Sequence, residues 1–465
     1  MTDSMQVAAP VAEGRILKLM FSIFEAQGLQ YAILRNYETL PERVGARDVD
    51  ILIPPEEIKK ASAAIMYLAE KQGLLVAHHY CDERLLQFIL VHRTGLNQLF
   101  DLKIDFFTSN QIYGLEVMSA REMLCNPLRH RGIPVVAEPV QLLDKFLFHV
   151  VVGHALHPKY NARFARIATQ ESGILFNALA PLTGKAEAEG MIGALSAGQG
   201  SDIPSLNFWQ RMRVLGRLWR RQRAGGVLQM TRFLYERLRN HLRPAGLFVS
   251  ISGPDGSGKT TVIELVLPHL RQLYGSDNVA YYHFRPTVLP RIAEVARAAK
   301  ALDQVDEDYA RPHRAEPSGI IGSAGRLSYY LLDYILGYFR RVYPELVDRK
   351  VILFDRYYQD MIADPGRSRI RMPTSILRLA ARLLPLPRFS FFIRVDPEEV
   401  HRRKQELSLD EISELNARYD DLATRGFLIP IDNDVAPEVA AAKIVDFIIE
   451  HGDRSARRLL ARRGI

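Results

Sequence analysis

The stretch that decides the fold is LFVSISGPDGSGKTTVIELVLPHLRQLY, residues 247–274. Its first six residues, Leu247 to Ser252, are mainly apolar, which predicts a buried strand. The nine residues GPDGSGKTT that follow fit the pattern GxxxxGK[ST], and the apolar spacing after them predicts a helix. Small residues let backbone N–H groups surround a phosphate group, and the N-terminus of a helix adds positive potential. The stretch therefore predicts a phosphate-binding loop between a strand and a helix.

This pattern gives each residue type an expected role toward ATP and Mg²⁺. Lys259 is expected to reach the β- and γ-phosphates, and Thr260 is expected to ligate Mg²⁺. The metal also needs a carboxylate at the end of a second strand, and the segment VILFDRYYQD supplies Asp355. Arg356 follows directly, and its guanidinium is expected to hold a second phosphate group. The residues expected to bind ATP are Gly253, Asp255, Gly256, Ser257, Gly258, Lys259, Thr260 and Thr261.

Together these motifs make residues 246–450 resemble the thymidylate kinase family. As in that family, the loop carries an acidic residue, Asp255, the strand-like VAYYHF runs into Arg285, and an aromatic residue follows Arg356. The resemblance implies an α/β fold in which helices flank a parallel sheet. It also implies an enzyme that uses ATP and Mg²⁺ and transfers a phosphoryl group to a small phosphorylated acceptor. In that family's pattern Asp255 would accept a hydrogen bond from a sugar hydroxyl of the acceptor, while Arg285 and Arg356 would hold its phosphate.

A second part of the resemblance concerns the segment FFIRVDPEEVHRRKQEL, which is similar to the family's last buried strand and the lid that follows it. The loop itself has no arginine, so Arg402, Arg403 or Lys404 is expected to supply the charge that closes over the transferred phosphoryl group. A solvated helix face is the alternative interpretation of these three residues.

Departures from the family pattern concern the acceptor. Ser252 stands where the family usually has a glutamate, and Tyr334 stands where an arginine is expected. The segment ADPGRSRIRM after the second strand is also unusual, and Arg367 within it is a candidate acceptor-binding residue. A nucleoside monophosphate is the first expectation. A sugar-linked or nucleotide-sugar acceptor in surface polysaccharide synthesis is one alternative, and an ATP-dependent switch or scaffold without transfer to a small molecule is another.

The N-terminal half carries a second carboxylate motif. Asp48 and Asp50 lie two residues apart on a predicted strand, so both side chains emerge on the same face. With a third carboxylate from a neighbouring strand, for which Asp105 is preferred over Asp101, they could hold Mg²⁺ ions. The order of these segments resembles the minimal nucleotidyltransferase domains of the polymerase β type, with Arg35 where that family has a glycine-rich turn. The resemblance leaves open whether this half transfers a nucleotidyl group or only binds a substrate.

Composition and charge set the remaining expectations for the 465 residues. A net charge of +8 favours anionic partners, and two cysteines without metal-type spacing indicate a reducing, cytoplasmic environment. Between Arg211 and Arg243 ten arginines accompany one acidic residue, which predicts basic amphipathic helices. A bridging helix with a solvated face is the first interpretation of this segment; peripheral contact with a membrane or polyanion is the second. No specific nucleic-acid partner is predicted, and a homodimer is left open.

The expected organisation has four parts. Residues 11–183 form a nucleotidyltransferase-like α+β domain with C-terminal helices, and residues 184–245 form a linker and the basic helical segment. Residues 246–450 form the α/β domain with the phosphate-binding loop, and residues 451–465 form a basic tail.

Overall fold

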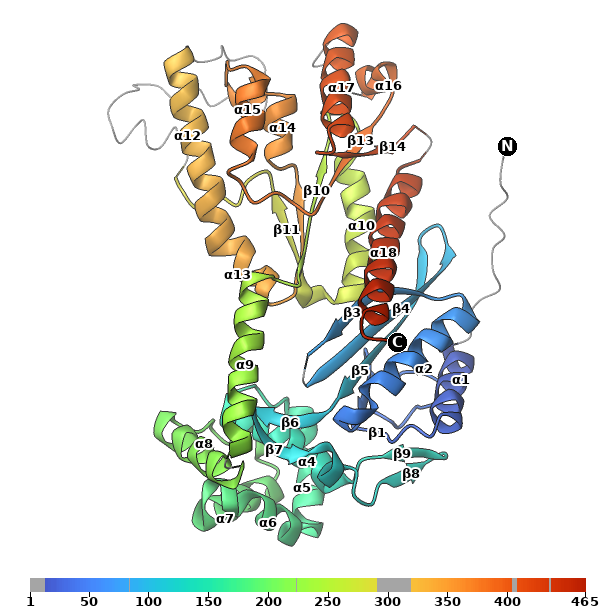
Figure 1. Ribbon diagram of the computed structural model, residues 1–465, viewed down its shortest axis with the longest axis vertical. Helices are drawn as coiled ribbons and strands as arrows, with labels where there is room; N and C mark the ends of the chain where they lie inside the picture. Colours follow the sequence, from blue (N-terminus) through green and yellow to red (C-terminus); the bar gives the residue numbers. More distant parts are fainter. Residues whose placement is uncertain (1–12, 83, 223, 291–318, 404–407, 435) are drawn as a thin grey trace. The chain divides into compact units, whose positions relative to one another are not determined.

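The computed structural model describes the chain except for residues 1–12, 83, 223, 291–318, 404–407 and 435 (Figure 1). The described residues divide into two compact units. Unit 1 comprises the residues up to Leu238 together with Ile449–Ile465, and unit 2 comprises Arg239–Ile448. None of the described helices is long and apolar enough to cross a membrane.

Unit 1 is built on a mixed sheet with the strand order β3-β4-β5-β2-β1-β9-β8 within the described residues. Its strands are β1 (Ala32–Ile33), β2 (Val49–Leu52), β3 (Leu75–Cys81), β4 (Leu85–Gly95), β5 (Gln98–Phe107), β8 (Leu128–His130) and β9 (Ile133–Val135). The central strands β2 and β5 are parallel, and Asp50 lies opposite Asp105 in their register. A separate hairpin of β6 (Ser109–Ile112) and β7 (Leu115–Ser119) follows β5.

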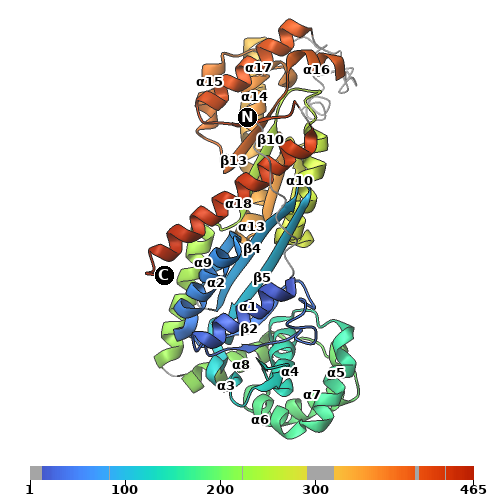
Figure 2. The same cartoon turned by 90° about the vertical axis from the view of Figure 1, so that its right-hand side faces the viewer.

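The helices of unit 1 form two groups. The helices α1 (Glu13–Ala26) and α2 (Ile58–Gln72) contribute to one buried core with the sheet (Figure 2). A second core is helical. The short helix α3 (Ala120–Met123) lies between β7 and β8. The helices that follow the sheet are α4 (Glu138–Leu147), α5 (Asn161–Gln170), α6 (Ser172–Thr183), α7 (Lys185–Ser196), α8 (Phe208–Gln222) and α9 (Ala224–Leu242), and the last turn of α9 belongs to unit 2.

Unit 2 is a parallel five-stranded sheet, within the described residues, in the order β11-β12-β10-β13-β14. Its strands are β10 (Leu247–Ser252), β11 (Val279–His283), β12 (Val351–Asp355), β13 (Phe389–Arg394) and β14 (Ile429–Asp432). Its helices are α10 (Lys259–Tyr274), α12 (Ile320–Gly337), α13 (Tyr343–Val347), α14 (Tyr358–Ala363), α15 (Thr374–Ala381), α16 (Pro397–Arg403), α17 (Leu409–Thr424) and most of α18 (Pro437–Ala461).

Both faces of this sheet are covered by helices. Successive side chains of a strand point to opposite faces. Phe391 on β13 packs against Phe447 of α18, with ring centroids 5.4 Å apart, whereas its neighbour Phe392 stacks on Tyr419 of α17 at 4.8 Å. The two helices therefore lie on opposite faces, as the predicted α/β arrangement requires.

Two expectations about chain organisation were wrong. The start of the expected linker, after residue 184, is the helix α7, because Ala188, Met191, Ile192 and Leu195 recur at helical spacing and are buried. Residues 451–465 are not a free tail, since α18 continues to Ala461 and Ala456 and Leu460 are buried in the core of unit 1.

Candidate functional site

The phosphate-binding loop of unit 2 joins the end of β10 to the start of α10 and is shaped by three glycines. Gly253, Gly256 and Gly258 have φ angles of +147°, +89° and +81°, which L side chains rarely adopt. A Cβ atom on Gly253 would lie 2.9 Å from the carbonyl oxygen of Ile393, and one on Gly258 would lie 2.9 Å from Nδ2 of Asn433. The backbone of β13 therefore leaves no room for a side chain at Gly253, and at Gly258 the positive φ and the Asn433 side chain both favour glycine.

Polar groups are buried inside this loop. The ammonium group of Lys259 donates to the carbonyl oxygen of Pro254 at 2.6 Å and lies 4.0 Å from a carboxylate oxygen of Asp255. Burial lowers the pKa of Lys259 to about 7, and Arg356 adds to the decrease while Asp255 opposes it. The Ser257 hydroxyl is buried and has no hydrogen-bond partner among the described residues. A buried cation and an unsatisfied hydroxyl in a glycine-shaped loop fit a phosphate group.

The second strand brings its carboxylate beside the loop. In the parallel register of β10 and β12, Asp355 lies opposite Ile251, two residues before Gly253. One carboxylate oxygen of Asp355 is 3.0 Å from Nδ1 of His283, and the other is buried without a hydrogen-bond partner in the described part of the chain. Thr260 follows Lys259 in the first turn of α10 and is exposed. An unsatisfied carboxylate oxygen is a suitable ligand for Mg²⁺, and Thr260 and Asp355 are the residues that would hold it.

The carboxylate of Asp255 forms ion pairs with two arginines. Asp255 accepts from Arg356 at 2.5 Å and from Arg367 at 2.6 Å. Arg356 adopts a positive φ of 69°, and its buried guanidinium also donates to the Gly253 carbonyl oxygen at 3.2 Å. The structure thus brings together three of the residues assigned to the acceptor from the sequence, Asp255, Arg356 and Arg367.

Arg285, the fourth residue assigned to the acceptor, pairs with a different carboxylate. Its guanidinium lies 3.0 Å from Asp333, which is fully buried and also accepts from the backbone N–H groups of Val288 and Leu289. The Tyr330 ring lies below the same guanidinium, 4.6 Å from its centroid. The adjacent Tyr334, which replaces an expected arginine, is buried and does not enter this ion pair.

The sequence interpretation overlooked Asp360. Its carboxylate is buried, accepts from the Ser252 hydroxyl at 2.5 Å and from the Tyr419 hydroxyl at 2.8 Å, and lies 3.9 Å from Nε of Arg356. Asp360 stands four residues after Arg356 in the segment DRYYQD, in the first turn of α14, and a second aspartate so close to Asp355 was the signal that could have identified it. Asp360 thus contacts both Ser252, the residue before the loop, and Arg356, which donates to the loop.

The two lid arginines differ in position. Both bond the Glu399 carboxylate within α16. Arg403 lies nearer to the loop, since a Cβ atom on Gly258 would be 3.6 Å from its guanidinium nitrogen Nη1. Lys404, the third candidate, lies outside the described residues. Of the two described arginines, Arg403 is therefore the one placed to contact a phosphate on the loop.

Unit 1 contains a second cluster of charged residues. Oxygen atoms of Asp48, Asp50 and Asp105 lie within 4.8 Å of one another, because β2 and β5 are paired in register. Lys103 bridges Asp48 at 3.0 Å and Asp105 at 3.2 Å, and Arg35 contacts Asp50 at 2.6 Å. Burial raises the pKa of Asp50 to about 6, against the opposing effect of Arg35. Three converging carboxylates form a donor set that fits Mg²⁺.

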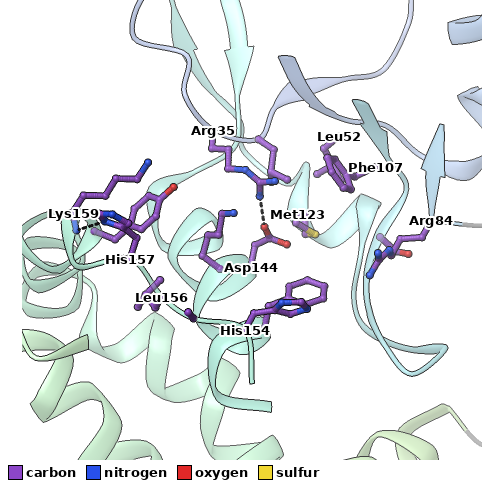
Figure 3. Close-up of a pocket in the computed structure, with 16 residues that line it drawn as sticks. Arg35, Leu52, Arg84, Phe107, Met123, Asp144, His154, Leu156, His157 and Lys159 are labelled. Atoms are coloured by element: carbon purple, nitrogen blue, oxygen red, sulfur yellow. Dashed lines mark hydrogen bonds and ion pairs between the residues drawn. The ribbon is translucent and has the colours of Figure 1, made fainter. Parts of the chain in front are cut away.

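A pocket of about 460 Å³ borders this cluster (Figure 3). Arg35 joins the two features, since its guanidinium also contacts Asp144 in the pocket wall at 2.9 Å. The sequence interpretation did not assign a role in a site to the other charged residues and histidines of the wall, which are Arg84, Asp144, Lys145, His154, His157 and Lys159. His149 is separate from them: its ring nitrogens contact the carbonyl oxygens of His154 and Ile203. Cations outnumber acids in this wall, which suits an anionic ligand.

No protein-family model matches the chain. Part of the chain is homologous to thymidylate kinases. It is 27% identical to the thymidylate kinase of Leuconostoc mesenteroides over 126 residues, which are 27% of this chain and 52% of that protein. It is 26% identical to a probable thymidylate kinase of Pyrobaculum calidifontis over 220 residues, 46% of this chain and 100% of that protein. The chain spans about half the length of the first curated relatives it matches.

Among solved structures, thymidylate kinases are again similar to part of the chain. The enzyme of Ehrlichia chaffeensis matches 44% of this chain and 99% of its own, with 20% identity and a TM-score of 0.31. The enzyme of Candida albicans matches 45% of this chain and 93% of its own, with 16% identity and a TM-score of 0.33.

Proposed function

We propose that unit 2 is an ATP- and Mg²⁺-dependent kinase that transfers a phosphoryl group to a small phosphorylated acceptor. The observation that supports this most is the loop, which holds Lys259 and the unsatisfied Ser257 hydroxyl and has the Asp355 carboxylate at the end of the neighbouring strand β12. The partial homology to thymidylate kinases points to the same class of reaction.

The residues of the loop act mainly by position and charge. Lys259 holds a cation where the β- and γ-phosphates of ATP are expected, and Arg403 offers a second cation at Gly258. Bound Mg²⁺ would neutralise charge on the phosphate oxygens, and Thr260 and Asp355 would hold it. Because the transferred phosphoryl group carries its charge on exposed oxygens, these fixed cations stabilise the transition state.

The acceptor is proposed to bind at the cluster of Asp255, Arg356 and Arg367. Without an acceptor the two guanidinium groups share one carboxylate, so an incoming phosphate would release an arginine and leave Asp255 able to accept from a hydroxyl group. A nucleoside monophosphate offers both groups and is our first choice. A sugar-linked or nucleotide-sugar phosphate offers the same two groups and is the alternative.

The test is a transfer screen with γ-labelled ATP on the full chain. Nucleoside monophosphates are offered beside phosphorylated and free sugars, with Lys259→Ala as the blank, which we expect to lower transfer by about 100-fold or more. Label on thymidylate or another nucleoside monophosphate supports the first choice, and label on a sugar phosphate supports the alternative. Bound ATP without label on any acceptor favours an ATP-dependent switch or scaffold and contradicts the kinase.

A second candidate function belongs to unit 1. The convergence of Asp48, Asp50 and Asp105 favours a nucleotidyltransferase-like site, either catalytic or binding only. Incubation with α-labelled nucleoside triphosphates tests it. Asp48→Asn combined with Asp50→Asn should abolish any incorporation, and Asp101→Asn on the same strand as Asp105 is the matched control. Incorporation that persists in the double variant would place that chemistry elsewhere.

A further inference from the structure

Two helices of unit 1, α8 and α9, expose large apolar side chains to solvent. Each helix keeps one face on the protein: Val214 and Leu218 of α8 are buried, and Phe233 of α9 lies against Gly114 in the β6–β7 hairpin. The opposite faces are exposed, and we call them together the α8–α9 surface. Its apolar residues are Phe208, Trp209, Met212 and Trp219 on α8, and Val227, Leu228, Leu234, Tyr235 and Leu238 on α9.

These side chains form stripes along the helices. At about 100° per residue, Phe208, Met212 and Trp219 fall within an arc of about 40° on α8, and the five residues of α9 fall within about 120°. Trp219 lies where the two helices join, since a Cβ atom on Gly226 at the start of α9 would be 3.5 Å from it. Trp209 is 74% exposed and Trp219 is 51% exposed. So many exposed apolar side chains on two consecutive helices indicate a surface that a membrane or a protein partner covers.

The α8–α9 surface is also strongly basic. Ten arginines accompany one glutamate between Arg211 and Arg243. Some of them anchor the helices, as Arg217 does by donating to the Leu182 carbonyl oxygen. Arg213 and Arg220 instead lie on α8 beside its apolar stripe. They are exposed and form no ion pair with any described residue. Their positive charge is therefore available to an anionic partner.

We propose that the α8–α9 surface binds the surface of a bilayer that contains anionic lipids. Tryptophan favours the boundary between headgroups and acyl chains, leucine and valine insert below it, and arginine pairs with lipid phosphates. A second copy of the chain fits less well, because a two-fold contact would place arginine against arginine. A nucleic acid would match the charge but not the aliphatic residues of α9, which offer no ring for stacking. The proposal does not depend on the activity of either unit.

The chain supplies its own probe, because Trp209 and Trp219 are its two tryptophans. The full chain is mixed with phosphatidylcholine vesicles that contain or lack phosphatidylglycerol, and binding is followed by co-flotation. With phosphatidylglycerol we expect flotation, a shift of tryptophan emission to shorter wavelength, and quenching by brominated acyl chains. Emission already at short wavelength before lipid is added would mean that the protein itself covers the stripe, and it would overturn the proposal.

Two matched double variants distinguish binding through the α8–α9 surface from binding driven by the net charge of the chain. Arg213→Glu with Arg220→Glu should weaken vesicle binding by at least about tenfold. Arg458→Glu with Arg462→Glu makes the same charge change at exposed positions of α18 and its end, and it should leave binding within about twofold. Equal losses in both variants, binding without bromolipid quenching, or preference for a polynucleotide over the vesicles would each reject a membrane-binding surface.

Discussion

Arg402 and Arg403 are adjacent and bond the same carboxylate, yet only Arg403 lies close to the loop glycine Gly258. We expect Arg403→Ala to lower kcat for phosphoryl transfer by about 10- to 1000-fold, since a cation at the transferred group stabilises charge that develops in the transition state. Arg402→Ala, which removes the same charge from α16, should change kcat by less than about threefold. Steady-state kinetics on both variants checks this. Similar losses in the two variants would show that the lid acts through its net charge.

His79 predicts a pH dependence of stability. It lies on β3 beside Phe88, with ring centroids 5.0 Å apart, and neither ring nitrogen has a hydrogen-bond partner among the described residues. Burial lowers the pKa of His79 to about 4, and Arg463 adds to the decrease. The unfolded chain takes up the proton at higher pH than the folded one, so the free energy of unfolding falls as pH drops from about 6.5 to about 4.

His79→Phe should remove that contribution, which we expect to be on the order of 2 kcal/mol at most because the ring keeps some contact with solvent. Urea unfolding of the two proteins at several pH values, followed by circular dichroism, measures the difference. Parallel curves for the two proteins between pH 6.5 and 4 would show that His79 titrates as it does in the unfolded chain.

At the level of single residues, local motifs were predictable and long-range partners were not. The loop from Gly253 to Thr260 and the placement of Asp355 follow from patterns that lie within one strand–loop–helix or at one strand end. The partners of Arg285 and Arg367, by contrast, stand 48 and 112 residues away along the chain. Such ion pairs depend on how strands are ordered in the sheet, and a single sequence carries little information on that order.

Among the helices and strands, we expect the end of α18 to affect the stability of unit 1, because its last turns belong to that unit. Leu460 is 2% exposed in the core of that unit, and Asp453 accepts from the backbone N–H of Val76. We expect Leu460→Ala to lower the free energy of unfolding of unit 1 by about 2 to 4 kcal/mol. Trp209 and Trp219 both lie in α8 of unit 1, so denaturant unfolding monitored by their fluorescence reports on this unit.

Leu459→Ala is the matched control for this element, since the neighbouring leucine is 44% exposed and should cost less than about 1 kcal/mol. If Leu460→Ala lowered the free energy of unfolding by no more than Leu459→Ala does, the end of α18 would contribute little to the stability of unit 1. The basic composition of residues 451–465 had suggested a tail. The helical spacing of Ala456 and Leu460 among the arginines instead indicates a helix with one apolar face. Whether that face is buried depends on strands far away in the sequence.

For the whole molecule, two compact units each carry an arrangement that fits a divalent metal, and this predicts two separable classes of site. Mn²⁺ binding to the full chain, measured by electron paramagnetic resonance, should show one class that requires ATP and one that does not. Thr260→Ala with Asp355→Asn should weaken the ATP-dependent class by at least about tenfold, because it removes the ligands expected beside the phosphate-binding loop. Asp48→Asn with Asp50→Asn should do the same to the other class alone.

The independence of these two classes is the decisive part of the experiment. Each donor set is built on a separate sheet, the carboxylates of unit 1 on β2 and β5 and Asp355 of unit 2 at the end of β12, so substitutions in one should leave the other intact. Asp101→Asn, which removes a carboxylate from β5 outside the cluster, should leave both classes unchanged. If either double variant abolishes both classes, the two units share a single metal-dependent reaction. Loss of the ATP-dependent class alone from both double variants would instead show that the unit 1 carboxylates serve the kinase.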